Sequence, residues 1–392
     1  MIVKLVDIFN LQMGKTPARN NKAYWNDGEY DWISISDLGN NIKYVSSTKE
    51  KITELAIKES GIKKVPSHTL LMSFKLSVGK TAITKYEVYT NEAIMAFIPN
   101  HKYDVYIDYF YYLFSWKDWS NDTSRAVMGA TLNKSTLGQI MVKIPPLDEQ
   151  RKIAETLDKL SDLIAKRKQQ LEKLDLLVKS RFIEMFGDPA LNPYNWKISK
   201  LGEYMTILTD FSANGSYELL DSNVIMYDEP NYAVMIRTTD LESGNWNSGL
   251  KYIDKKAYEL LSKSKLYGGE LIMNKIGSAG KIYIMPHIGK PASLGRNAFM
   301  FRFDERIDTT FLFTLLTSDY GTAEIQQYVR GAVTKTITKD STREIRIIVP
   351  PIELQKQFAD FVQQTEKTKT IINQSLEKLE MLKKALMQEY FG

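Results

Sequence analysis

The chain has 392 residues, of which 43% are hydrophobic and 25% are charged, proportions that are ordinary for a globular protein of two or three domains. It contains no cysteine, which excludes disulfides and thiolate metal sites, and its net charge of +5 permits a polyanionic partner without requiring one. No stretch is apolar for long enough to span a bilayer, and the first residues, with Lys4 and Asp7, do not resemble a signal peptide, so we expect a cytoplasmic protein without membrane contact.

Residues 1–144 are termed the first head. Short runs of β-branched and aromatic residues are broken there by glycine, asparagine and aspartate, which is typical of strands, and residues 106–116 are predicted to be helical. We therefore expect an α+β fold. Basic and amide side chains in its loops are the candidate binding residues of this head: Lys75, Lys80, Arg125, Asn133 and Lys134.

Residues 145–187 are predicted to form one long helix, the central spacer helix. Its apolar residues recur with alternating spacings of three and four, which is the heptad seam of a coiled coil. The seam includes Leu157, Leu160, Leu171 and Leu174. The helix begins after Pro145-Pro146 and ends at Gly187, and residues 188–196, with two prolines and two asparagines, form a linker.

The chain then repeats this order. Residues 197–348, termed the second head, show the same alternation of short strands and loops, and residues 349–392 are predicted to form the C-terminal spacer helix. Its seam includes Leu376 and Leu379, and we expect the two helices to pack antiparallel as a coiled coil. The candidate binding residues of the second head are Asn274, Lys275, Lys281, Arg296, Asn297, Arg330, Lys335 and Lys339.

An internal duplication underlies this order. Residues 144–187 align without a gap with residues 349–392, at an offset of 205, and 14 of the 44 aligned pairs are identical. The heads align more loosely, with Gly79-Lys80 matching Gly280-Lys281. The sequence therefore predicts a pseudo-twofold repeat that contacts its partner in two places, which is typical of a recognition protein.

Signals for catalysis fail on inspection. Gly79-Lys80-Thr81 resembles the end of a phosphate-binding loop, but the glycine required five residues before Gly79 is Phe74. The three histidines are isolated in the sequence, and the chain has no Pro-Asp dipeptide of the kind that the common nuclease core requires. We therefore expect a non-catalytic chain with no metal site and no cofactor of its own.

The basic loops favour a nucleic-acid partner. Lysine and arginine neutralise phosphates, and arginine, asparagine and lysine also hydrogen-bond base edges in the major groove. At any single position the alternative is an ordinary solvated loop charge. Recurrence at matching places in both heads favours the DNA interpretation.

These residues resemble the specificity subunit of type I restriction–modification enzymes, over essentially the whole chain. The motifs that carry the resemblance are residues 24–28 with 32–34, 71–80, 90–93, 144–150 and 350–355. No one motif is specific, but their order, the duplication and the two long helices together are.

The resemblance implies two target recognition domains, each reading one half of a bipartite site in double-stranded DNA, with the helices as the spacer between them. It also implies assembly with two modification subunits, which bring S-adenosylmethionine and adenine methylation. Restriction subunits would bring ATP with magnesium, translocation and cleavage. None of that chemistry would lie in this chain.

Two alternatives remain open from the residues. The chain could be a scaffold or adaptor for protein partners, with the helices as its functional surface and no DNA binding. It could also be the specificity subunit of a related restriction class that lacks the ATP-driven motor.

Overall fold

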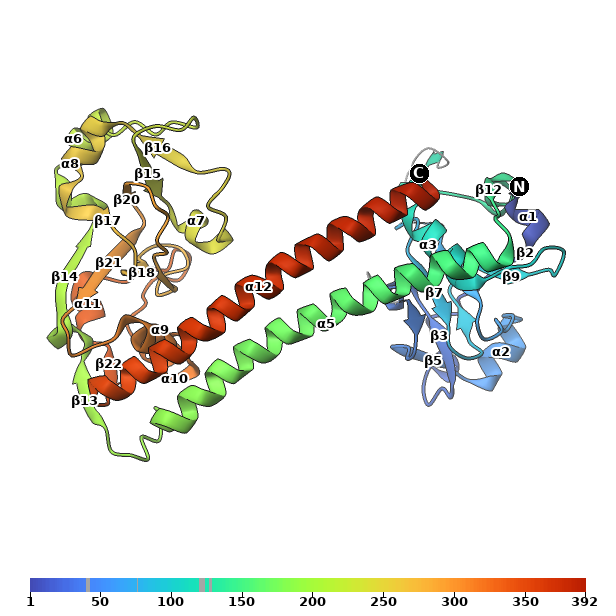
Figure 1. The fold of residues 1–392 in the computed structure, drawn as a ribbon. Coiled ribbons are helices and arrows are strands. Elements are labelled where there is room, and N and C mark those ends of the chain that lie inside the picture. Colours follow the sequence, from blue (N-terminus) through green and yellow to red (C-terminus); the bar gives the residue numbers. More distant parts are fainter. Residues whose placement is uncertain (40–42, 76, 120–123, 127–128) are drawn as a thin grey trace. The chain divides into compact units, whose positions relative to one another are not determined.

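The computed structural model describes residues 1–39, 43–75, 77–119, 124–126 and 129–392, without the side chains of 124–126 and 129–131. The chain divides into two compact units (Figure 1). Unit 1 comprises Met1–Lys168 with Asn373–Gly392, and unit 2 comprises Gln169–Ile372. Each unit therefore contains one head and part of each long helix.

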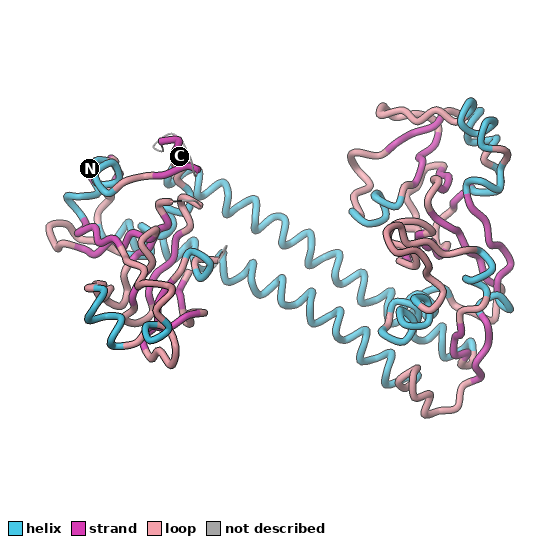
Figure 2. The backbone as a smooth tube through the Cα atoms, turned by 180° about the vertical axis from the view of Figure 1, so that it is seen from behind, coloured by secondary structure: helices cyan, strands magenta, loops and turns pink. Residues whose placement is uncertain are grey.

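The first head combines strands with a few short helices (Figure 2). Its strands are β1 (Ile2–Lys4), β2 (Phe9–Met13), β3 (Tyr30–Ile33), β4 (Tyr44–Val45), β5 (Glu50–Ile52), β6 (Leu70–Ser73), β7 (Thr81–Thr84), β8 (Tyr89–Thr90), β9 (Ile94–Pro99), β10 (Ser124–Ala126), β11 (Gly129–Thr131) and β12 (Met141–Lys143). Its helices are α1 (Leu5–Ile8), α2 (Glu54–Ser60), α3 (Ile107–Trp116) and α4 (Lys134–Gln139). The main sheet has the order β2-β9-β6-β7-β4, and a smaller sheet has the order β5-β3-β8.

The second head has the same plan. Its strands are β13 (Lys197–Lys200), β14 (Met205–Asp210), β15 (Ala233–Ile236), β16 (Lys251–Ile253), β17 (Lys265–Leu266), β18 (Leu271–Asn274), β19 (Ile282–Ile284), β20 (Ala292–Leu294), β21 (Ala298–Phe303) and β22 (Arg346–Val349). Its helices are α6 (Tyr217–Asn223), α7 (Thr238–Ser243), α8 (Lys255–Leu260), α9 (Thr309–Thr317), α10 (Asp319–Gln326) and α11 (Lys339–Arg343). The two main sheets have the orders β14-β21-β18-β19 and β16-β15-β20-β17.

The duplication extends to strand register. The order β2-β9-β6-β7 in the first head corresponds to β14-β21-β18-β19 in the second. Ser73 pairs with Ile94 across β6 and β9, and Asn274 pairs with Ala298 at the equivalent place across β18 and β21. The predicted α+β fold with an internal repeat is confirmed.

The two long helices are α5 (Leu147–Phe186) and α12 (Ile352–Phe391), each about 60 Å long at 1.5 Å per residue. In unit 1, Ser161 and Lys168 of α5 contact Lys383 and Glu380 of α12, at 2.8 and 2.9 Å. Rising residue numbers along α5 thus meet falling numbers along α12, and the pairing within this unit is antiparallel.

Unit 2 has the same antiparallel pairing. The Phe358 ring of α12 packs edge-on against Phe182 and Phe186 of α5, with centroids 5.4 and 5.6 Å apart, and Lys369 pairs with Asp175 at 2.5 Å. Gly187 ends α5 with a φ of +74°, and a Cβ there would lie 2.4 Å from Pro193 Cγ. Only glycine fits this turn.

Burial along the helices is uneven. Leu157 and Leu160 are buried in unit 1, whereas Leu171 and Leu174 in unit 2 and Leu376 and Leu379 in unit 1 are half-buried. The seam also includes buried Thr365, whose hydroxyl donates to Phe361 O at 2.9 Å. The seam residues are therefore most deeply buried where the helices also pack against a head.

A buried glutamine fixes the first turn of each helix to its head. The Gln150 amide donates to Asp104 O at 3.0 Å and Pro145 O at 2.9 Å, and its oxygen accepts from Tyr106 N at 2.9 Å. Gln355 repeats the pattern, donating to Pro350 O at 2.8 Å and Arg306 O at 3.3 Å and accepting from Asp308 N at 2.9 Å. Both side chains are fully buried. Among the described residues, no helix is both long and apolar enough to cross a bilayer.

Candidate nucleic-acid interface

The hairpin between β6 and β7, and its counterpart between β18 and β19, carries the glycine and lysine of the repeat. Ser73 N donates to Lys80 O and Asn274 N to Lys281 O, both at 2.9 Å. The glycines have φ values of +93° (Gly79) and +87° (Gly280), which favour a residue without a Cβ.

Close packing also requires these glycines. A Cβ on Gly79 would lie 2.8 Å from the Trp119 ring, and one on Gly280 would lie 2.5 Å from Ile325 Cγ2. The two hairpins are thus turned and packed in the same way, although the residues that cover them differ.

Backbone hydrogen bonds join three loops in each head. In the first head, Phe74 N donates to Ala93 O at 2.9 Å, and Leu132 N donates to Phe74 O at 2.8 Å. In the second, Lys275 N donates to Asn297 O at 2.9 Å, and Ile337 N donates to Lys275 O at 3.1 Å. Side chains far apart in the sequence are therefore gathered at one place in each head.

The first head presents free cationic groups at this place. Lys134, at the start of α4, is exposed, and Lys80 is half-buried. Within the described part of the chain, neither ammonium group has an ion-pair partner. Lys75 lies with its Nζ 5.2 Å from the Phe74 ring centroid, and Asn133 caps α4 by accepting from Thr136 N at 2.8 Å. The predicted contact Arg125 has a side chain that lies outside the described residues.

Most cations of the second head are paired. Lys281 forms an ion pair with Glu242, and Arg296 pairs with Asp221 at 2.9 Å while its guanidinium lies 5.2 Å from the Phe211 ring centroid. Hydrogen bonding to Glu242 raises the pKa of Lys281.

Three further candidates of the second head lie in or beside the joined loops. Arg330 donates to the carbonyls of Gln327 at 2.5 Å and Val329 at 3.1 Å. Lys335 and Asn297 are exposed, and Lys335 O accepts from Gly277 N at 2.9 Å.

Asn274 differs from the exposed loop residues among the candidates. It is 2% exposed and its amide donates to Ser278 Oγ at 2.8 Å, so its side chain is turned into the hairpin, and a base contact by Asn274 stays a prediction. Lys275 is also largely shielded from solvent: its side chain is 16% exposed, and its Nζ lies 2.9 Å from the Asp210 carboxylate. The sequence shows a residue type beside a glycine, but the direction of each side chain depends on partners elsewhere in the chain.

The Asp210 carboxylate forms ion pairs with two of the lysines that were predicted to contact DNA. Lys275 Nζ lies 2.9 Å from Asp210 Oδ2, and Lys339 Nζ lies 2.8 Å from Asp210 Oδ1. Burial raises the pKa of the Asp210 carboxyl, but hydrogen bonds from Lys339 and Lys275 outweigh burial, and the pKa lies below its ordinary value. The sequence offered no signal for this residue.

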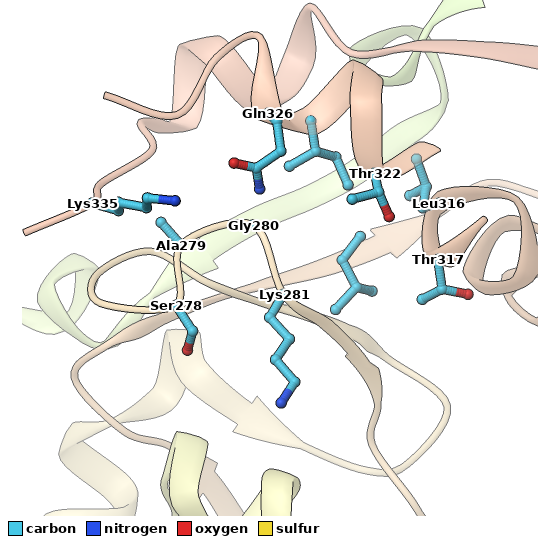
Figure 3. A pocket seen from close by; sticks show the side chains of 11 residues that line it. Ser278, Ala279, Gly280, Lys281, Leu316, Thr317, Thr322, Gln326 and Lys335 are labelled. Carbon is cyan, nitrogen blue, oxygen red and sulfur yellow. The ribbon is translucent and has the colours of Figure 1, made fainter. Parts of the chain in front are cut away.

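A hollow of about 420 Å³ lies beside the β18–β19 hairpin (Figure 3). Its lining includes Lys281 and Lys335 with the polar side chains of Ser278, Thr317, Thr322 and Gln326. Figure 3 shows Lys281 extending from the hairpin away from Gln326, whereas Lys335 approaches from the neighbouring loop. Within the described residues, no group of three or more histidine, cysteine, aspartate or glutamate side chains is placed to hold a metal ion.

Comparisons with known proteins decide the family. The type I restriction modification DNA specificity domain matches residues 1–174 and again 193–381. The chain belongs to this family. It is a specificity subunit of a type I restriction–modification system, and its heads are DNA sequence recognition domains.

Relatives and solved structures agree with this assignment. The specificity subunit of the type I restriction enzyme MjaIX from Methanocaldococcus jannaschii is 28% identical, over 92% of this chain and 85% of its own length. The EcoprrI specificity subunit of Escherichia coli is 23% identical, over 90% of this chain and 84% of its own length.

The fold is shared with solved specificity subunits. The crystal structure of the S subunit from M. genitalium has a TM-score of 0.61 at 13% identity, covering 100% of this chain and 96% of that one. A chain from a structure describing assembly of the type I system has a TM-score of 0.58 at 15% identity, covering 100% and 97%.

Proposed function

We propose that each head of this specificity subunit reads one half of an asymmetric, bipartite site in double-stranded DNA. The observation that carries the proposal is that the same two backbone hydrogen bonds join the three loops in both heads, with different side chains. Within the described residues, Lys134 of the first head has no ion-pair partner, for example, whereas its counterpart Lys339 is paired with Asp210. A common frame with different side chains suits two readers of different sequences.

The long helices are the spacer in this proposal. Gln150 and Gln355 each bind the first turn of a helix to a head through three hydrogen bonds, and both are fully buried. These buried junctions support the role proposed for the helices, which is to set the spacing of the two half-sites.

Two modification subunits would dock on repeated apolar pairs of the spacer helices. Leu176 and Leu177 of α5 are 61% and 47% exposed, and Met381 and Leu382 of α12, at the same offset of 205, are 63% and 48% exposed. Large apolar side chains that remain exposed at equivalent positions indicate two equivalent protein contacts.

The chemistry would then lie in the partners. In this proposal the chain is non-catalytic and acts in the cytoplasm. The modification subunits carry S-adenosylmethionine for adenine methylation, and restriction subunits carry ATP with magnesium for translocation and cleavage.

Exchanging heads tests the reading of half-sites. Residues 197–343 are replaced by the corresponding segment of another specificity subunit, and the methylated motif is read by methylome sequencing in cells that carry the modification subunit. We expect one half of the motif to change and the other to persist. A change in both halves would refute the two-reader proposal.

Charge substitutions test the docking. Leu176→Asp with Leu177→Asp, or Met381→Asp with Leu382→Asp, should each remove one modification subunit from the purified complex, measured by its mass in solution. Ile371→Asp is the matched control, because Ile371 is 67% exposed but aligns with Lys166 at the repeat offset. Retention of both modification subunits by both double variants would contradict the assignment.

A further inference from the structure

The Asp210 carboxylate is the meeting point of the loops in the second head. It lies at the end of β14, and its side chain is 9% exposed. Lys275 begins the β18–β19 hairpin and Lys339 is the first residue of α11, so the carboxylate joins two segments that are 64 positions apart in the sequence.

The third loop, which contains Arg296 and Asn297, contacts Phe211, the residue after Asp210. Phe211 directly follows Asp210, and the Arg296 guanidinium lies 5.2 Å from its ring centroid. Lys275 N also donates to Asn297 O at 2.9 Å. All three joined loops of this head are thus connected to Asp210 or the residue after it.

Among the described residues of the first head, no carboxylate lies at the equivalent place. Met13 pairs with Met95 across β2 and β9, and Asp210 pairs with Phe299 at the equivalent place across β14 and β21. At the place of Lys275 the first head has Phe74, which is 2% exposed and belongs to the apolar core. The first head therefore has a 50% exposed methionine at the place of Asp210 and a buried phenylalanine at the place of Lys275, and the fold does not require a charge there.

A buried ion pair at a place where the same fold accepts uncharged side chains calls for another explanation than stability. Burying an ion pair costs desolvation that apolar residues of similar size avoid, whereas its hydrogen bonds fix the geometry of the groups that it joins. Asp210 accepts one bond from each lysine and so fixes the hairpin relative to α11.

We propose that Asp210 is a positioning residue of the second head. By neutralising Lys275 and Lys339 it fixes the β18–β19 hairpin against α11, and it thereby sets the sequence discrimination of this head without contacting DNA. The proposal rests on the proposed function of the heads as separate readers.

The test uses the full chain assembled with its modification subunits. Asp210→Asn keeps the size of the side chain and removes the charge. Binding is measured on the natural site and on sites with single base changes in either half. We expect the variant to lose about 10-fold in discrimination at one or more positions of the half-site read by the second head, within the range of a base contact. Discrimination in the other half should not change.

Glu270→Gln is the matched control. Glu270 is 5% exposed and pairs with Arg302 at 2.9 Å, directly before β18, whereas Lys275 directly follows that strand. We expect Glu270→Gln to lower the melting temperature about as much as Asp210→Asn does, and to keep the discrimination between base sequences in both half-sites. Should Asp210→Asn fail to fold, Lys339→Gln removes one of the two bonds at a more exposed side chain, and we expect the same loss in a smaller degree.

The possible results separate the two proposals. Unchanged discrimination in Asp210→Asn, or in Lys339→Gln where the first variant does not fold, overturns the positioning role. An equal loss in Glu270→Gln overturns it too, because general loosening of the head would then explain the effect. If the exchange of residues 197–343 changes one half of the motif while Asp210→Asn changes none, this inference alone fails. If the exchange changes both halves, the two-reader function fails.

Discussion

Replacing Gln150 by methionine tests how the spacer is joined to the first head. Methionine has a similar length and fills the same space, but it cannot make the three hydrogen bonds to Asp104 O, Pro145 O and Tyr106 N. Because Gln150 is fully buried, water does not replace them in the folded structure.

The expected loss follows from these bonds. A typical intramolecular hydrogen bond contributes about 0.5–1.5 kcal/mol, and a buried donor left without a partner costs about 1–3 kcal/mol. Three lost bonds and an unsatisfied Tyr106 N–H give roughly 3–7 kcal/mol for this junction, or more than about 100-fold in its opening equilibrium.

Amide hydrogen exchange at Tyr106 is the direct assay, since this N–H loses its acceptor. We expect its protection to fall by more than about 100-fold. The equivalent amide, Asp308 N in unit 2, is an internal control because Gln355 still accepts from it. Lys152→Met is the matched control, placing the same side chain two residues further along α5 where the position is exposed. If Tyr106 in Gln150→Met keeps its protection within threefold of this control, the reasoning is refuted.

Three further predictions follow from the described contacts. Leu157→Ala should destabilise unit 1 by about 2–5 kcal/mol because Leu157 is fully buried, whereas Leu163→Ala, at a side chain 45% exposed, should cost under about 0.5 kcal/mol in denaturant unfolding. Lys80→Ala should weaken DNA binding on all sequences and flatten the salt dependence by about one unit, and an unchanged slope would exclude a phosphate contact. Burial raises the pKa of Asp108, but hydrogen bonds from Lys43 and Tyr44 outweigh it, so the folded pKa is depressed. The resulting stabilisation is present above about pH 4 and is lost as pH falls through the folded value, so Asp108→Asn should lower stability at pH 7 and reduce the acid dependence of unfolding.

The sequence by itself determined the features that are local or periodic. The heptad spacing predicted both long helices, because the apolar residues of a coiled-coil seam recur at regular spacing within one continuous segment. Pro145-Pro146 and Gly187 predicted where the first helix begins and ends, since these residues restrict the backbone wherever they occur. Gly79 and Gly280 marked equivalent hairpins, and both have the positive φ that glycine favours.

Only the tertiary structure decided which side chains face outward and which are paired. Asn274 and Lys275 follow the same pattern as exposed loop residues, yet one is buried and the other is bound to a carboxylate 65 positions earlier in the chain. Lys134 and Lys339 are equivalent by sequence, yet Lys339 is paired with Asp210, and Lys134 has no ion-pair partner among the described residues. Such pairings depend on which distant segments meet in the fold, and the residue type at a single position does not reveal its partner.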